Sequence, residues 1–249
     1  MSGHSKWSTI KRQKGAADAK RGTLFTKLSK EIEAAARGGD PNPEMNFKLR
    51  LAVQKARDSN MPVDNIERAI KRASGELGGV QPAEHHYEGY GPSGAAILIE
   101  VLTDNKNRTT AEVRNVFSRG GGNLGENGCV TWIFQPKGVI VVEALGNADD
   151  LALLAIDAGA EDVKQDGDTL EIQTVPEELE AVRKKLEAQN IKITSSELTR
   201  IPQNMIALDK KSAIQALKLM DRLEELDDVQ RVYTNADFPD DAIEEYGGQ

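Results

Sequence analysis

Cysteine and histidine are scarce in this chain. Cys129 is the single cysteine among 249 residues, so the chain can form no internal disulfide and no cysteine-cluster metal site. Two of the three histidines, His85 and His86, are adjacent, and neighbours in a strand point to opposite faces, where they cannot chelate one ion well. The sequence therefore predicts no metal site and no cofactor.

Long apolar runs are missing as well. None approaches the roughly 20 residues that a membrane-spanning helix needs. No apolar segment follows the first methionine, as a secretory signal would require. Together with the single cysteine, these absences predict a protein of the reducing cytoplasm that does not act on a membrane.

Sequence motifs of nucleotide-dependent and hydrolytic enzymes are not found. Residues 120–125 match G-x-G-x-x-G, but a dinucleotide fingerprint follows a strand and begins a helix. Here the glycines follow an expected helix and precede an expected strand, so we interpret them as a flexible connection that is a candidate contact loop. There is no Gly-Lys-Ser/Thr sequence, and no serine or cysteine lies beside a recognisable base. The chain is expected to be no enzyme and to have no small-molecule substrate.

Charge is distributed unevenly along the chain. Residues 1–80 carry 16 Lys/Arg and 9 Asp/Glu, a net charge of +7, whereas residues 81–249 carry 16 and 31, a net charge of −15. Such an asymmetry indicates that the N-terminal part binds a polyanion, which the acidic remainder repels. A solvated basic face is the alternative.

The first 75 residues have the pattern of short helices. A basic helix is expected from Ser8 or Thr9 to Gly22, and a second one, capped by Thr23, to the glycines at 38 and 39. A third is expected to end near Asn60, and a fourth to begin in a capping box of Asp64 and Glu67. This pattern predicts a small helical domain.

After Tyr87 the apolar residues follow strands and helices in alternation. Residues 138–200 read βαββαβ, the order of a ferredoxin-like unit. Residues 87–137 and 201–236 each read βαβ, and together they make a second such unit. The fold class predicted is α+β, with an N-terminal helical domain followed by two ferredoxin-like α/β domains, one inserted in the other. The expected strands are 95–102, 129–135, 139–143, 161–164, 169–174, 193–199, 204–208 and 229–234, and the expected helices are 109–119, 149–158, 176–188 and 210–223.

This order divides the chain into four parts. The predicted boundaries are a basic helical domain at 1–79, a discontinuous α/β domain at 80–137 and 201–238, an inserted α/β domain at 138–200, and an acidic tail at 239–249. Tandem half-units in one continuous sheet are the alternative. Connections that do not cross favour the insertion.

Eight candidate nucleic-acid contacts lie in the N-terminal basic arm, here residues 1–30. Trp7 has two interpretations, stacking on a base or ribose and packing against the first helix. The cations suit phosphates, and no recognition helix with Asn, Gln and Arg spaced for base edges is found, so binding is expected to follow the nucleic-acid backbone. The candidates are Lys6, Trp7, Lys11, Arg12, Lys14, Lys20, Arg21 and Lys27.

Residues 104–110 are a second candidate contact. They connect an expected strand to a helix that Thr109 and Glu112 are expected to cap, which places Lys106 and Arg108 at a helix N-terminus, where anions are favoured. The other interpretation is a turn in which Asp104 and Asn105 satisfy their own backbone.

Several motifs resemble the YebC/PmpR family, and the resemblance extends from residue 2 to about residue 238. The chain departs from the family's pattern at Thr23, Ser93 and Cys129, where Lys, Gly and Ser are common. The motifs are Gly3-His4-Ser5-Lys6-Trp7, Arg21-Gly22, Asn60-Met61-Pro62, Tyr87-Glu88-Gly89-Tyr90-Gly91-Pro92, Thr103-Asp104-Asn105-Lys106-Asn107-Arg108-Thr109 and Gly121-Gly122-Asn123-Leu124-Gly125.

The resemblance implies a three-domain protein without a catalytic triad. Bacterial members are described as DNA-binding transcriptional regulators of the cytoplasm, mitochondrial relatives are translational activators, and some bacterial members resemble ribosome-associated factors that relieve stalling. Two functions therefore remain, a DNA-binding transcriptional regulator and a translation factor bound to ribosomal RNA, with an enzyme as a distant third. The residues show no dimer symmetry, and a monomer is slightly favoured.

Overall fold

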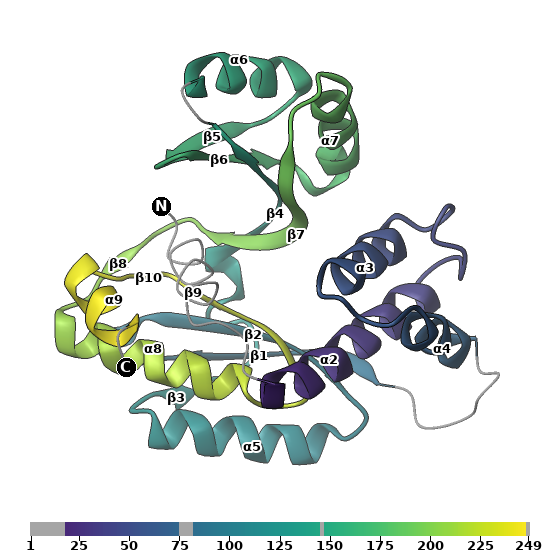
Figure 1. Ribbon diagram of the computed structural model, residues 1–249. Helices are drawn as coiled ribbons and strands as arrows, with labels where there is room; N and C mark the ends of the chain where they lie inside the picture. The colour runs from purple at the N-terminus through teal and green to yellow at the C-terminus, as the bar shows by residue number, and fades with distance from the viewer. Residues whose placement is uncertain (1–17, 75–81, 145–146, 248–249) are drawn as a thin grey trace. The chain divides into compact units, whose positions relative to one another are not determined.

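The computed structural model describes residues 18–74, 82–144 and 147–247 (Figure 1). They form two compact units. Phe134–Gln203 make one unit, and the described residues before Phe134 and after Gln203 make the other. The chain leaves the larger unit once and returns to it.

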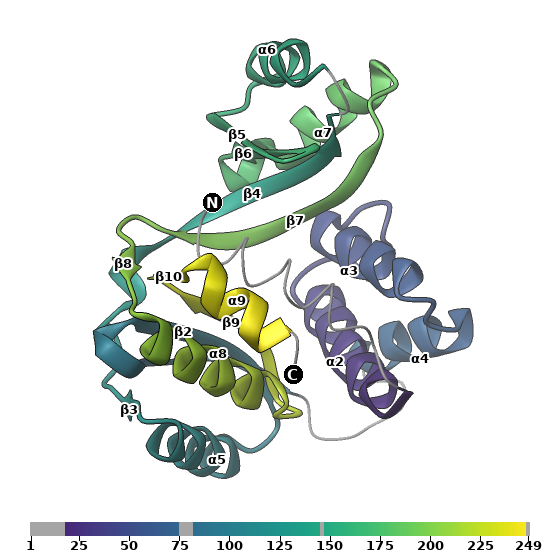
Figure 2. The same ribbon diagram turned by 60° about the vertical axis from the view of Figure 1, so that its left-hand side comes forward.

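Three helices form the N-terminal part of the larger unit, α2 (Asp18–Arg37), α3 (Phe47–Asp58) and α4 (Val63–Ala73). Figure 2 shows them packed against one another. Their apolar residues recur at helical spacing and meet in one core. The most buried members are Leu28, Ile32, Leu49, Ala56, Ile66 and Ala69.

The ends of these helices differ in part from the sequence prediction. Helix α2 passes through Gly22 and Thr23 without a break, and the hydroxyl of Thr26 donates to the carbonyl of Gly22 at 3.1 Å. The prediction that Thr23 caps a new helix is therefore wrong. The capping box of Asp64 and Glu67 is wrong as well, because Pro62 is the N-cap of α4 and caps it with no side-chain hydrogen bond.

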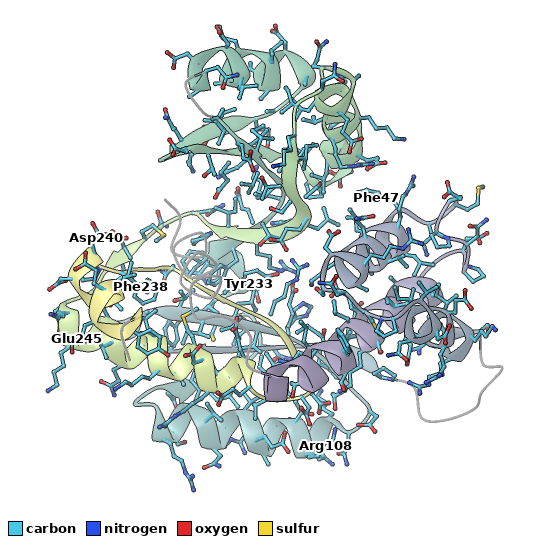
Figure 3. All side chains as sticks on the ribbon, in the orientation of Figure 1. Phe47, Arg108, Tyr233, Phe238, Asp240 and Glu245 are labelled. Carbon is cyan, nitrogen blue, oxygen red and sulfur yellow. The ribbon has the colours of Figure 1, made fainter. Side chains whose placement is uncertain are left out.

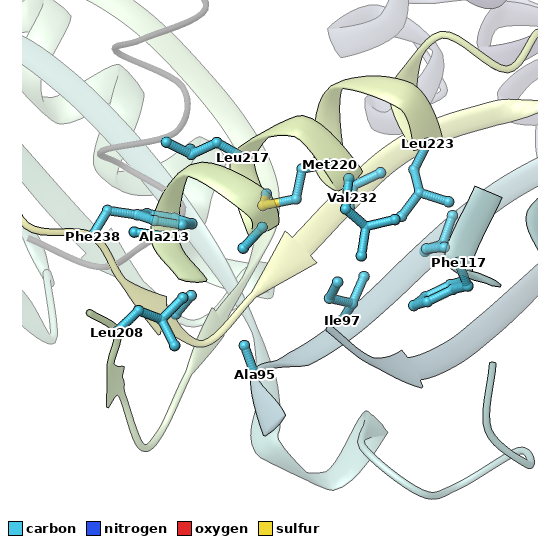
Figure 4. Close-up of a cluster of buried hydrophobic side chains, with 14 of the residues drawn as sticks. Ala95, Ile97, Phe117, Leu208, Ala213, Leu217, Met220, Leu223, Val232 and Phe238 are labelled. Atoms are coloured by element: carbon cyan, nitrogen blue, oxygen red, sulfur yellow. The ribbon is translucent and has the colours of Figure 1, made fainter. Parts of the chain in front are cut away.

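A four-stranded antiparallel sheet with the order β3-β1-β2-β9 forms the centre of the larger unit. Helices α5 and α8 cover one face of the sheet with a buried apolar layer (Figure 4). In this layer Phe117 of α5 and Met220 of α8 pack with Ile97 of β2. The elements are β1 (Ala83–Tyr90), η1 (Pro92–Gly94), β2 (Ala96–Thr103), α5 (Lys106–Arg119), β3 (Asn123–Leu124), η2 (Thr131–Ile133), α8 (Lys210–Glu224) and β9 (Val229–Thr234).

This sheet is a ferredoxin-like arrangement in which one strand has changed its place in the sequence. Taken in the order β2, α5, β3, β1, α8, β9, the elements read βαββαβ. The fourth of these elements, β1, comes first in the chain and forms a hairpin with β2. A ferredoxin-like fold would have this strand between β3 and α8. Here the connection from β3 to α8 contains the smaller unit instead.

Two predicted strands of this part are therefore corrected. Residues 129–135 do not form one strand, because a turn and η2 precede β4, and the short β3 at Asn123 takes the sheet edge beside β1. Residues 204–208 contribute only β8 (Ile206–Ala207), which pairs in parallel with β10 (Ala236–Asp237) outside the main sheet.

The segment expected to be an acidic tail contains a helix. Helix α9 (Asp240–Gly247) packs against α8. Ala242 and Tyr246 are buried in the core of the larger unit, and the Tyr246 hydroxyl donates to Asp221. The last residues that the structure describes thus belong to the folded unit.

The smaller unit is a ferredoxin-like βαββαβ fold. Its antiparallel sheet has the order β5-β6-β4-β7, and α6 and α7 pack against the sheet and each other. At Gly138 a Cβ atom would lie 2.8 Å from Cβ of Leu179, so glycine permits the close packing of α7. The α+β fold class with two ferredoxin-like units is confirmed. The elements are β4 (Phe134–Glu143), α6 (Ala148–Ala158), β5 (Asp162–Asp166), β6 (Thr169–Thr174), η3 (Pro176–Glu178), α7 (Leu179–Ala188) and β7 (Ile193–Pro202).

Candidate nucleic-acid interface

Most of the basic arm lies outside the part of the chain that the structure describes. Lys6, Trp7, Lys11, Arg12 and Lys14 precede α2, and the side chains of Lys20 and Arg21 are not described either. Their contacts with nucleic acid remain predictions.

Lys27 and Lys30 contact the end of α8 and the residues that follow it. The Lys27 ammonium donates to the carbonyl of Glu224, the last residue of α8, where a cation is favoured by the helix dipole. Lys30 Nζ donates to the carbonyl of Asp227 at 3.2 Å and to Oδ1 of Asp228 at 2.6 Å. A phosphate contact by Lys27 would have to replace its bond to α8.

Asp228 is the centre of a buried polar cluster. Its side chain is 3% exposed, and its Oδ2 lies 2.7 Å from Nη2 of Arg108, 2.9 Å from Oγ1 of Thr103 and 2.7 Å from Oγ1 of Thr109. With Lys30 on Oδ1, the carboxylate joins α2, the end of β2 and the start of α5.

The electrostatic state of Asp228 follows from these contacts. Burial alone would raise the pKa of its carboxyl group, but the hydrogen bonds from Arg108, Lys30, Thr109 and Thr103 outweigh burial and hold the pKa well below its usual value. Asp228 is thus ionised at neutral pH, and its charge is balanced by two cations.

Residues 104–110 are held mainly by contacts within the protein. Asn105 caps α5 by accepting a hydrogen bond from the backbone N–H of Arg108 at 3.2 Å, so the predicted cap at Thr109 is wrong. Thr109 is buried one turn into the helix. Arg108, labelled at the start of α5 in Figure 3, also pairs with Asp104 at 2.8 Å.

Lys106 differs from Arg108. It is the first residue of α5 and is exposed. Within the described residues its ammonium makes no hydrogen bond or ion pair, while its backbone carbonyl accepts from Thr110. Lys106 and Arg108 are the two cations of this segment that were predicted to bind phosphate. Of these two, only Lys106 has a side chain without a partner among the described residues.

A groove of about 830 Å³ lies between α2, α4, the start of α5 and the loop before β9. Six carboxylates line it, against four cations. Arg72 pairs with Glu33, and Lys30 and Arg108 pair with Asp228. The groove is therefore unsuited to a polyanion.

Exposed cations that sequence reasoning did not single out lie on α3 and α4. Their side chains make no hydrogen bond or ion pair with any residue in 18–74, 82–144 or 147–247. The net positive charge of residues 1–80 includes these cations. Whether each one is exposed, however, depends on which faces of the helices pack into the core. They are Lys48, Arg57, Arg68 and Lys71.

The glycine-rich residues 120–125 connect α5 to β3 and pack closely. Gly121 has a φ of +77°, which favours glycine, and a Cβ on Gly122 would lie 2.7 Å from the carbonyl oxygen of Tyr90. The two sides of the connection are held against β1 and α8, so close packing explains these glycines.

Glu88 of β1 organises the next turn of the chain. Its buried carboxylate accepts from the backbone N–H groups of Gly128, Val130 and Thr131 at 2.6, 2.8 and 2.8 Å. Burial tends to raise the pKa of Glu88, but these hydrogen bonds outweigh burial and lower it. The turn over residues 126–131 is thereby fixed to the sheet.

Neither a metal cluster nor a membrane-spanning helix occurs in the described residues. No group of three or more His, Cys, Asp or Glu residues there could hold a metal ion. No helix among them is both long and apolar enough to cross a membrane.

The chain is similar to proteins of several bacteria over its whole length. A protein of Dehalococcoides mccartyi named "Probable transcriptional regulatory protein" is 57% identical, with 100% of both chains covered. A protein of the same description from Desulfosudis oleivorans is 54% identical over 96% of this chain and 98% of its own.

A solved structure agrees with the fold. The crystal structure of a conserved hypothetical protein from Aquifex aeolicus has a TM-score of 0.81 and 48% identity, and the match covers 89% of this chain and 92% of that one. The family description "TACO1/YebC protein N-terminal domain" matches residues 5–76, and "TACO1/YebC second and third domain" matches residues 82–236. The chain belongs to the TACO1/YebC family.

Proposed function

We propose that this protein is a nucleic-acid-binding regulator of gene expression that binds the phosphate backbone through its N-terminal basic part. One observation carries the proposal, the division of charge into +7 over residues 1–80 and −15 over residues 81–249. A polyanion is attracted to the first part and repelled by the second, which orients the protein on its target.

The basic arm supplies the largest share of binding in this proposal. If about five of its cations engage phosphates, the logarithm of affinity falls with the logarithm of salt with a slope of about −3.5 for a single strand or −4.5 for duplex DNA. The exposed cations Lys48 and Arg57 of α3 and Lys71 of α4 are further candidate phosphate contacts. Lys106 is a further contact from the α/β part.

The names of the relatives support a role in the regulation of transcription, and DNA is the target that we propose for that role. Proteins more than 50% identical over nearly the whole chain are named probable transcriptional regulatory proteins. Regulation of transcription is thus the first candidate for the process in which this chain acts.

Binding to ribosomal RNA is the second candidate, and the chemistry of α3 and α4 favours it. Several exposed side chains of α3 and α4 without a partner among the described residues are those of lysine and arginine, such as Lys48 and Lys71, which suit phosphates. Gln54, a residue type that reads adenine, is bonded to Asp58 on its own helix. A factor that recognises a folded RNA by its backbone needs no base-reading helix.

Crosslinking in cells distinguishes the two targets. The protein is crosslinked, purified under denaturing conditions, and the attached nucleic acid is sequenced. Enrichment of promoter DNA supports the first candidate, and enrichment of ribosomal RNA supports the second. A yield no higher than that of a variant with Lys6, Lys11, Lys14 and Arg21 changed to Ala would contradict both.

A further inference from the structure

Two exposed aromatic side chains lie at one place on the larger unit. Among the described aromatic residues, only Tyr90 and Trp132 are largely exposed, at 40% and 65%. The others, such as Phe117 and Tyr233, are buried or half-buried. Exposed tryptophan and tyrosine are enriched in binding surfaces.

Both rings are fixed by the same backbone oxygen. The Tyr90 hydroxyl and the Trp132 Nε1–H each donate to the carbonyl of Cys129 at 3.1 Å. Because both donors approach one atom, the polar ends of the two rings lie within about 6 Å of each other. The polar atoms are satisfied, and the exposed surfaces of the rings are left for a partner.

The turn that carries this oxygen is held to β1 by several hydrogen bonds. Glu88 accepts three backbone N–H groups of the turn, and its own carbonyl accepts from Gly125 at 2.7 Å. A preorganised pair of rings loses little conformational entropy when a ligand binds.

The turn that carries the shared acceptor of the two rings is acidic. Glu126 is exposed and begins the turn that ends at Cys129, whose N–H donates to the Glu126 carbonyl at 3.2 Å. No lysine or arginine occurs between Arg119 and Lys137. Burial raises the pKa of the Cys129 thiol, and the negative charges of Glu88 and Glu126 raise it further.

We propose that Tyr90 and Trp132 form a docking site for an arginine side chain of a basic protein partner, with Glu126 as the counter-charge. A cation is attracted to the face of an aromatic ring, and the planar guanidinium also stacks on it. An unpaired base would stack on the same rings, but its phosphates would be repelled by Glu126, in a segment that has no lysine or arginine from residue 120 to residue 136. The site is therefore distinct from the proposed nucleic-acid surface.

Fluorescence tests the proposal, because Trp7 and Trp132 are the two tryptophans of the chain. In the full-length Trp7→Phe variant, Trp132 is the only tryptophan. A peptide of Arg-Gly repeats is expected to change its emission saturably. The same peptide with citrulline, which keeps the planar shape without the charge, is expected to leave the emission unchanged.

Affinity measured by calorimetry gives a second readout. Trp132→Leu is expected to weaken binding of the Arg-Gly peptide by about 2- to 5-fold, the range for one exposed cation–π contact, and Glu126→Gln is expected to weaken it as well. Asp157→Asn, which removes an exposed charge from α6, is the matched control for general attraction to the acidic surface. Unchanged melting temperatures show that the variants are folded.

Three results would overturn the proposal. One is equal binding of the arginine and citrulline peptides, and another is undiminished affinity in Trp132→Leu. The third is quenching of Trp132 by oligouridine without any response to the Arg-Gly peptide, which would identify the two rings as a base-stacking site.

Discussion

Lys30 donates a hydrogen bond of 2.6 Å to Asp228, a residue 198 positions further along the chain. The same carboxylate accepts from Arg108 at 2.7 Å. One buried anion thus links the N-terminal helices to the sheet and to the start of α5. Residues 104–110 were predicted to contact phosphate, but Arg108 and Thr109 of this segment bind Asp228 instead.

Asp228→Asn is expected to lower the free energy of unfolding by about 2–4 kcal/mol, because it leaves Arg108 and Lys30 without their shared anion. Urea unfolding measures the decrease. Asp104→Asn is the control, since Asp104 is 48% exposed and its pair with Arg108 is worth about 0–1 kcal/mol. Equal decreases in the two variants would contradict the central role of Asp228.

Stability is expected to depend on pH through the same carboxylate. The folded pKa of Asp228 is depressed, so its contribution is present above the unfolded pKa of about 3.9 and disappears as the pH falls below that value towards the folded pKa. Unfolding curves between pH 6 and about pH 3 should show a smaller decrease in stability for Asp228→Asn than for the unchanged protein. An equal decrease in stability for the two proteins over this pH range would show that Asp228 does not cause the pH dependence.

Elements with a clear local period could be predicted from the sequence. The strand at Val229–Thr234 and the strand at Thr169–Thr174 have the predicted bounds, because alternation and turn residues are properties of neighbouring positions. The same holds for the end of α3, which is expected near Asn60 and lies at Asp58.

Features that depend on distant contacts could not be predicted. Whether Asn105 or Thr109 caps α5 is decided by the buried partners of Thr109, and one of these is Asp228, 119 residues away. The strand β1 was not predicted at all, and its place between β2 and β3 is set by tertiary pairing. Which cations of α3 and α4 are exposed can be decided only when it is known which faces of these helices pack into the core.

Neutralising the basic arm is expected to weaken nucleic-acid binding on all sequences alike. Changing Lys6, Lys11, Lys14 and Arg21 to Ala should flatten the salt slope by roughly 0.7–0.9 for each phosphate that is no longer neutralised. Affinity at several salt concentrations measures this. The control changes four exposed cations outside the N-terminal part, Lys164, Lys184, Lys192 and Lys211, to Ala. An equal effect of both quadruple variants would show that binding follows net charge and not the arm.

Lys106 and Arg108 are expected to behave differently when each is changed to Ala. Arg108→Ala should lower the free energy of unfolding by about 1.5–3 kcal/mol, because it removes a charge-assisted hydrogen bond to buried Asp228. Lys106→Ala should leave stability within about 0.5 kcal/mol and lower affinity for nucleic acid several-fold. Both quantities are measured on each variant. Unchanged affinity in Lys106→Ala would restrict the contact surface to the N-terminal helices and arm.

The smaller unit is expected to fold by itself. Residues 134–203 contain a complete βαββαβ set, and their sheet and both helices share one apolar core with buried Ile140, Leu170 and Val182. Expressed alone, this segment should give a cooperative thermal transition. Residues 138–200, the predicted boundaries, should melt at a lower temperature, because Phe134 and Gln135 then no longer pair with Ile201 and Pro202 at the end of the sheet. A domain of about 70 residues is only marginally stable, so the pairing of these strand ends should be measurable. A molten or insoluble product from residues 134–203 would mean that this sheet needs the rest of the chain to fold.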